Sequence, residues 1–276
     1  MIAETTSMPQ VPTLLELFKS GVQFGHLVSK RYPKMQPYIF SIKNGIHIIN
    51  LEQTQKKLAA ALAFMTDVAG SGGTVLFVGT KQQARPIIAT YATAVHMPYV
   101  KERWLGGTFT NFSEIARVIQ RFHELKRKRE SGELDQYTKK ERLEFDREIN
   151  RLDRLVGGIA QMKKIPDALF VVDVKREHIA VAEAARKRVP IVALCDTNVN
   201  PTPIQYVIPG NDDAINAITL ITRLVSEAVA EGAARRQPAA PLAATGAAAA
   251  DVVEPVGSSP AAGEAAAAPF VPDDAV

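Results

Sequence analysis

Acidic residues that directly follow apolar runs are the first candidates for chemistry in this 276-residue chain. Asp173 and Asp196 each follow a continuous apolar run, and Thr80 and Lys81 follow a third one. If these runs are parallel strands, Asp173 and Asp196 lie at the sheet edge where open α/β sheets bind ligands. One hypothesis is therefore an α/β enzyme, or a binding protein for a phosphorylated small molecule.

Phosphate-binding and catalytic motifs are missing around these residues. The turn at Gly79 matches neither the GxxxxGK(S/T) nor the GxGxxG pattern. No nucleophile paired with a base is readable near Asp173 or Asp196, and acids at strand ends commonly cap the next helix or loop. His123 and Glu124 lack a second histidine at zinc-protease spacing. We therefore expect no catalytic residue, no metal and no cofactor.

A basic segment with interleaved aromatic rings, residues 26–43, is a candidate for nucleic-acid binding. Its cations can meet phosphates, and its rings can stack on unpaired bases or riboses. The equally weighted alternative is a basic loop whose aromatic side chains point into the core. The candidate RNA contacts in and just after this segment are Lys30, Arg31, Tyr32, Lys34, Lys43 and Asn44.

A second candidate contact is the segment RWLGGTFTN at residues 103–111. Its two adjacent glycines permit close approach of the backbone, and its hydroxyl and amide side chains offer hydrogen bonds. Those hydrogen bonds could go to RNA or could cap a helix that begins near Phe112. We expect Trp104 to pack against the globule. The candidate RNA contacts here are Arg103, Gly106, Gly107, Thr108, Thr110 and Asn111.

The net charge suits a phosphate-rich partner once the carboxyl-terminal part is considered separately. The whole chain has 33 Lys and Arg against 29 Asp and Glu. Residues 232–276 hold two basic and five acidic residues, so the remainder holds 31 and 24, a net charge of +7. Such an excess favours polyanions through counterion release, although many basic enzymes never bind nucleic acid.

Residues 232–276 are rich in Ala and Pro and too poor in large apolar residues to offset ordering entropy, which predicts a disordered tail.

The elements that must position these residues alternate between strands and helices. Continuous apolar runs, typical of strands buried on both faces, occupy residues 74–79, 168–172 and 190–195. Helical patterns occupy residues 51–69, 82–95, 177–187 and 212–230. With right-handed crossovers, this order predicts an α/β, doubly wound, mostly parallel sheet of the Rossmann-like or flavodoxin-like kind.

Two local features refine this prediction. Residues 38–42 and 46–50 flank Lys43, Asn44 and Gly45, and an Asn-Gly pair between strand-like runs favours a tight hairpin. Pro86 would disrupt the interior of a helix, so we expect that helix to begin near Arg85, with the proline in its first turn.

Residues 112–156 form a distinct segment, in which 22 of the 41 residues from 114 to 154 are charged. Apolar residues still recur at helical spacing, and in the second half they follow the spacing of a two-helix coiled coil. Ser131 and Gly132 supply a break between the halves. We predict an antiparallel coiled-coil hairpin that projects from the globule, the alternative being two helices that lie on the sheet. The apolar residues are Ile115, Ile119, Phe122 and Leu125, then Phe145, Ile149, Leu152 and Val156.

The compartment can also be inferred from composition. The single cysteine, Cys195, excludes an internal disulfide framework. Residues 1–12 resemble neither a secretory signal nor a transit peptide, and no apolar run is long enough to span a membrane. We expect a cytoplasmic protein with no membrane partner.

Several blocks of the chain resemble the bacterial small-subunit ribosomal protein two family, the 30S ribosomal protein S2 family. The resemblance runs in order from about residue 14 to residue 224, and its blocks of eight to ten residues are very specific. Where the family usually has Trp-Asn before Pro-Lys-Met, this chain has Arg31 and Tyr32. The blocks include FGH at 24–26, NGIHIINL at 44–51, VLFVGTKQQA at 75–84, RWLGGTFTNF at 103–112, PDALFVVD at 166–173 and YVIPGNDDAI at 206–215.

This resemblance implies a structural, non-enzymatic constituent of the small (30S) ribosomal subunit in the bacterial cytoplasm. It implies binding to 16S ribosomal RNA and to neighbouring ribosomal proteins, a role in subunit assembly and translation, docking of ribosomal protein one, and no small-molecule substrate. The expected domains are a discontinuous α/β domain at 1–111 and 157–231, a coiled-coil insertion at 112–156 and a disordered tail at 232–276.

Overall fold

The structure is a computed structural model that describes residues 11–236. A five-stranded sheet forms its centre, and every strand runs parallel to its neighbours. The strand order is β5-β4-β6-β7-β8, so β5 lies on one side of β4 and β6 lies on the other. This is the flavodoxin-like order. The strands are β4 (Val75–Val78), β5 (Tyr99–Val100), β6 (Ala168–Val172), β7 (Ile191–Cys195) and β8 (Tyr206–Pro209).

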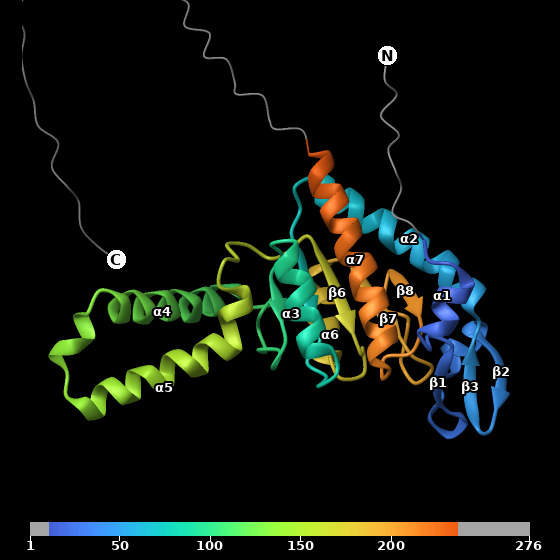
Figure 1. Ribbon diagram of the computed structural model, residues 1–276, viewed down its shortest axis with the longest axis horizontal. Helices are drawn as coiled ribbons and strands as arrows, with labels where there is room; N and C mark the ends of the chain where they lie inside the picture. The colour runs from blue at the N-terminus through green and yellow to red at the C-terminus, as the bar shows by residue number, and fades with distance from the viewer. Residues whose placement is uncertain (1–10, 237–276) are drawn as a thin grey trace, which may run out of the picture. The chain divides into compact units, whose positions relative to one another are not determined.

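Helices cover both faces of this sheet (Figure 1), as a doubly wound fold requires. On one face, Phe77 and Phe170 pack edge to face beneath α2 (Leu51–Gly70), α3 (Ala84–Ala94) and α7 (Ile215–Arg235). On the other face, Leu76 and Val171 pack with α6 (His178–Lys187) and with Trp104 and Phe109. The three predicted strands are confirmed, and β4, β6 and β7 are buried along their whole length.

The predicted late start of one helix is also confirmed. Helix α3 begins at Ala84, so Pro86 is its third residue and lies in the first turn, where a missing N–H group costs nothing.

The position of the tail boundary was predicted wrongly. Helix α7 continues to Arg235, and Gly232 is buried instead of beginning a disordered segment. A Cβ atom at Gly232 would lie 2.2 Å from the carbonyl oxygen of Thr66 in α2, so the glycine permits close packing of the two helices. The rest of the predicted tail, 237–276, lies outside the described residues.

A smaller antiparallel sheet, in the order β1-β3-β2, precedes α2 along the chain. The predicted hairpin is confirmed: Lys43 pairs with Ile46, and the turn residues Asn44 and Gly45 have φ angles of 50° and 75°. Positive φ at both positions is the requirement of a type I′ turn. The elements of this region are α1 (Leu14–Lys19), β1 (Phe24–Leu27), η1 (Val28–Lys30), η2 (Pro33–Tyr38), β2 (Ile39–Lys43) and β3 (Ile46–Ile49).

Helices α4 (Phe112–Glu130) and α5 (Lys139–Val156) occupy the charged segment, with a short helix η3 (Glu133–Gln136) between them. Gly132 has a φ of 76° and breaks the chain where the sequence indicated. The predicted apolar residues pack in one cluster, in which Phe145 is partly buried and the others are buried, and Arg121 bridges to Glu148 at 2.9 Å. The two helices run side by side (Figure 1), and η4 (Gly157–Ile159) follows α5. A coiled-coil supercoil and the division into domains stay predictions.

Candidate functional site

The carboxyl ends of the strands carry a cluster of ion pairs centred on Lys81. This side chain emerges just after β4, and its Nζ lies 2.8 Å from Asp212 Oδ1, 2.5 Å from Asp213 Oδ1 and 3.4 Å from Asp173 Oδ2. Asp173 follows β6, and the two adjacent aspartates lie in the loop after β8. Strand ends far apart in sequence therefore bring three carboxylates to one ammonium group.

Burial determines how these groups titrate. Burial, together with the neighbouring carboxylates of Asp173 and Asp196, raises the pKa of Asp212 to about 7, although Lys81 partly offsets this. Burial acts to lower the pKa of Lys81, but the attraction of Asp212 and the hydrogen bonds to both aspartates outweigh it, so the pKa of Lys81 is raised. The ammonium group thus stays charged and holds the acidic loop against the sheet edge.

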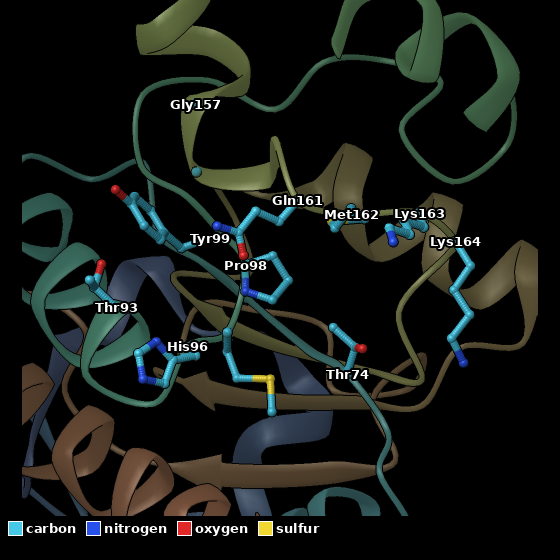
Figure 2. Close-up of a pocket in the computed structure, with 12 residues that line it drawn as sticks. Thr74, Thr93, His96, Pro98, Tyr99, Gly157, Gln161, Met162, Lys163 and Lys164 are labelled. Atoms are coloured by element: carbon cyan, nitrogen blue, oxygen red, sulfur yellow. The ribbon is translucent and has the colours of Figure 1, made fainter. Parts of the chain in front are cut away.

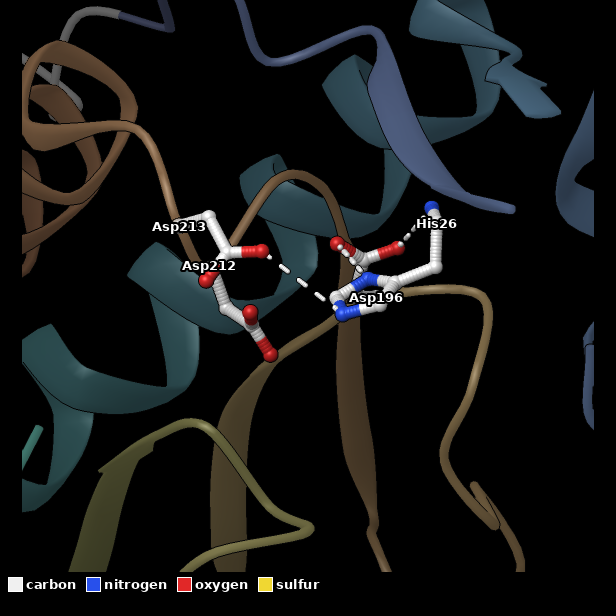
Figure 3. A group of neighbouring side chains, drawn as sticks. All are labelled: His26, Asp196, Asp212 and Asp213. Atoms are coloured by element: carbon white, nitrogen blue, oxygen red, sulfur yellow. Dashed lines mark hydrogen bonds and ion pairs between the residues drawn. The ribbon is translucent and has the colours of Figure 1, made fainter. Parts of the chain in front are cut away.

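His26 joins this cluster from β1 (Figure 3). Its Nδ1 lies 2.8 Å from Asp196 Oδ2 and its Nε2 lies 3.6 Å from Asp213 Oδ2. The hydrogen bond to Asp196 raises the pKa of His26, against the effect of burial. His26, Asp196, Asp212 and Asp213 each offer one ligand atom, and these atoms lie within 4.8 Å of one another, so one nitrogen and three oxygens could hold a divalent cation. We expected no metal site from the sequence, and nothing along the chain connects His26 with Asp196, 170 residues away.

The turn after β4 is occupied by a carboxylate of the protein itself. Glu177, which is buried, accepts hydrogen bonds from Thr80 N at 3.0 Å and from Thr80 Oγ1 at 2.5 Å. Arg176 Nε donates to the same hydroxyl oxygen at 2.9 Å. Burial raises the pKa of Glu177, and the hydrogen bonds from Thr80 partly offset this. A phosphate at this turn would have to displace Glu177 and approach the aspartates, so the geometry opposes a phosphorylated ligand.

The glycine-containing loop 103–111 also encloses an internal carboxylate. Glu183 of α6 accepts hydrogen bonds from Gly107 N at 2.7 Å, Phe109 N at 2.9 Å and Thr110 N at 3.1 Å, and Trp104 Nε1 lies 3.3 Å from it. Burial acts to raise the pKa of Glu183, but these hydrogen bonds outweigh it, so the pKa is lowered. Sequence reasoning missed Glu183, because its place in an apolar helical pattern gave no sign of its partners.

Several candidate RNA contacts in this loop therefore have internal partners. Gly107 N and both the N–H and hydroxyl groups of Thr110 bind Glu183. Thr108 is 1% exposed, and its hydroxyl donates to Leu105 O at 2.6 Å. Arg103, Gly106 and Asn111 are exposed. Asn111 precedes α4 without a side-chain cap to its backbone, so the capping alternative is wrong for this side chain.

The basic segment is divided between core and surface. Tyr32 and Tyr38 pack against the core, as expected for a basic loop whose aromatic side chains point inward, whereas Phe40 is 72% exposed. Lys30, Arg31 and Lys34 are exposed, although Arg31 contacts Gln36 and Lys34 Nζ donates to Thr202 Oγ1 at 2.9 Å. A hydrogen bond of 3.0 Å from Val28 N to Gly45 O brings this segment against the exposed turn of Lys43 and Asn44. We call Lys30, Arg31, Lys34 and Lys43 the basic surface.

Fold and site together define a doubly wound α/β protein whose ligand edge is filled by its own ion pairs. The family model described as ribosomal protein S2 matches residues 17–232. A small ribosomal subunit protein uS2 from Acidothermus cellulolyticus is 49% identical over 230 residues, covering 83% of this chain and 84% of the relative. Another from Nocardia farcinica is 48% identical over 226 residues, covering 82% and 79%. The chain therefore belongs to the ribosomal protein S2 family.

Family membership confirms two expectations from the sequence. The chain is a ribosomal protein of the small subunit with a structural role in translation, and it is not an enzyme. The enzyme hypothesis for Thr80, Asp173 and Asp196 is thereby overturned. Within residues 11–236, no helix combines the length and the apolar composition needed to cross a membrane.

Proposed function

We propose that this chain binds 16S ribosomal RNA through the basic surface and thereby supports assembly of the small subunit in the bacterial cytoplasm. The observation that carries the proposal is the exposure of all four cations, together with the Val28–Gly45 hydrogen bond, which joins the segment of Lys30 to the turn beside Lys43. Each phosphate that these cations neutralise releases counterions, which favours binding without bond chemistry.

Exposed aromatic surface adds to this proposal. The ring of Phe40 lies on β2, three residues before Lys43. An exposed ring on the same hairpin as Lys43 can stack on an unpaired base. The exposed Arg103, Gly106 and Asn111 remain further candidate contacts, whereas Tyr32 supports the surface from the core side.

Docking of ribosomal protein one and contacts with other small-subunit proteins belong to the same proposal. The family resemblance suggests them, and exposed apolar side chains supply a suitable surface. Leu15 and Phe18 of α1 are 60% and 59% exposed, and Phe24 of β1 is also exposed. Exposed apolar groups that lie close together are common at protein–protein contacts.

The salt dependence of binding tests the basic surface. Replacing Lys30, Arg31 and Lys34 by Ala should weaken binding to 16S RNA in small subunits depleted of this protein. The slope of log K against log salt concentration should flatten by roughly one for each phosphate that the variant no longer neutralises. Filter binding or sedimentation from low to moderate salt measures both quantities.

The matched control replaces Lys56, Lys57 and Arg186 by Ala, three exposed cations on α2 and α6. This control removes the same charge and should leave a steeper slope than the first variant. Equal slopes for the two variants would mean that net charge, and not this surface, drives binding.

A further inference from the structure

A cavity of about 510 Å³ lies at the amino ends of the strands, whereas the ion-pair cluster lies at their carboxyl ends. Thr74 directly precedes β4 and Pro98 directly precedes β5, so the cavity opens at the amino ends of these strands. Its other side is the segment 157–164 that follows α5, as Figure 2 shows. The volume falls within the range of roughly 300–1,000 Å³ that small-molecule sites occupy.

The cavity combines an aromatic wall, neutral hydrogen-bonding groups and positive charge. Tyr99 and Pro98 supply flat apolar surface, and Gln161 supplies an amide. Lys163 and Lys164 lie at one end (Figure 2). Lys164 Nζ pairs with Asp167 Oδ1 at 3.1 Å, so the positive charge offered to a ligand is that of Lys163. Among the described residues that line the cavity, none is acidic. This chemistry suits an unpaired base with an attached phosphate.

Two residues that line the cavity have a restricted backbone. His96 has a φ of 54°, in the left-handed region that costs a residue with a side chain roughly 1 kcal/mol or more. Its imidazole is exposed at the cavity, just after α3. Gly158 lies so close to strand β5 that a Cβ atom would meet Tyr99 O at 2.2 Å. The segment after α5 can therefore approach the Tyr99 wall only with glycine at this position.

We propose that this cavity, here called the hinge pocket, receives one unpaired nucleotide of the ribosomal RNA. The inference rests on the proposed RNA-binding function and adds a second, base-accepting site to it. The base lies along Tyr99 and Pro98, with Gln161 and the hydroxyl groups of Thr74 and Thr93 facing its edge. The phosphate lies toward Lys163. Because the pocket spans β5 and the segment leaving α5, an inserted nucleotide also fixes where the α4–α5 pair joins the sheet.

Photocrosslinking in the assembled particle tests this proposal. The full-length chain is added to reconstituted small subunits that lack it and that contain 4-thiouridine or 6-thioguanosine in their RNA. After irradiation, mass spectrometry identifies the attached peptides. We expect RNA attached to peptides that contain residues 93–99 or 157–164.

Matched variants separate the pocket from general RNA affinity. Gln161→Trp fills the hinge pocket and should lower cross-linking at these peptides by about tenfold, the loss expected for one stacked base. Gln53→Trp places the same side chain on the exposed surface of α2, which contributes no residue to the pocket lining, and should leave that yield unchanged. Lys163→Ala should flatten the salt slope by about one, whereas Lys187→Ala on exposed α6 should not.

The outcomes distinguish this inference from the proposed function. A chain that fails to join the particles contradicts the proposed function itself. A chain that joins them without cross-links at the hinge pocket, or with equal yields for the two tryptophan variants, overturns only the inference. Saturable binding of uridine 5′-monophosphate to the free chain at the hinge pocket, combined with absent RNA cross-links, would assign the pocket to a free nucleotide and overturn it as well.

Discussion

At the scale of single residues, three buried or largely buried carboxylates find three different kinds of partner. Asp212 pairs with the ammonium group of Lys81, Glu177 accepts hydrogen bonds from Thr80, and Glu183 accepts from three backbone N–H groups. A charge removed from water is tolerated only when such partners replace its hydration. These carboxylates therefore hold loops to the sheet, and they oppose an anionic ligand at the carboxyl ends of the strands.

The carboxylate of Glu183 should stabilise the loop 103–111 strongly. Glu183→Gln keeps the shape but removes the charge, and an uncharged acceptor facing several donors should cost about 2 kcal/mol in the free energy of unfolding at pH 7. Because the folded-state pKa of Glu183 is lowered from its ordinary value of 4.5, this stabilisation is present above that value and is lost as the pH falls through the folded-state pKa.

Urea unfolding of both proteins at pH 7 and at successively lower pH measures this effect. The difference between wild type and Glu183→Gln should shrink toward acid pH. The exposed Glu144→Gln in α5 is the control and should change little at any pH. A pH-independent difference would contradict a role for the charge.

At the scale of secondary structure elements, close packing of α2 against α7 decides where the globule ends. Gly232→Ala tests this packing, because a frayed helix end and a packed helix end predict changes of opposite sign in the free energy of unfolding. In a frayed helix end, alanine would stabilise the protein by up to about 1 kcal/mol. In the packed position, its Cβ atom collides with Thr66 O, so we expect a loss of about 1–3 kcal/mol, measured by thermal or urea unfolding.

The pairing of α4 with α5 should depend on apolar burial more than on the many ion pairs. Phe122→Ala removes a ring that is almost fully buried and should cost about 3–5 kcal/mol. A double-mutant cycle of Arg121→Ala and Glu148→Ala should give a coupling below about 1 kcal/mol, because the pair is largely exposed. Unfolding monitored by circular dichroism measures both free energies. A coupling energy between Arg121 and Glu148 larger than the loss caused by Phe122→Ala would contradict this prediction.

At the scale of the whole molecule, charge is distributed unevenly along the chain. Residues 237–276 contain five acidic residues and no basic ones, so ending the chain after Arg236 raises the net charge from +4 to +9. We expect this truncation to tighten non-specific RNA binding at low salt and to leave it nearly unchanged at high salt, where screening removes long-range attraction. Filter binding to an unrelated RNA measures the change, and unaltered low-salt affinity would contradict it.

The sequence by itself determined the elements whose signals are local. The buried strands at 168–172 and 191–195, the Asn44-Gly45 turn and the first-turn position of Pro86 follow from apolar runs and backbone restrictions within a few residues. The blocks of family resemblance likewise lie along the chain itself, and they indicated the family before any fold was known.

Only the tertiary structure decided which side chains meet. Nothing near His26 points to Asp196, and nothing near Gly107 points to Glu183, because these partners are joined through strand order and helix packing. The same holds for Gly232, whose burial depends on α2, and for the hinge pocket, whose walls come from Tyr99 and the segment after α5. Periodicity reports whether a residue faces the core, but contacts between distant segments are set by three-dimensional packing.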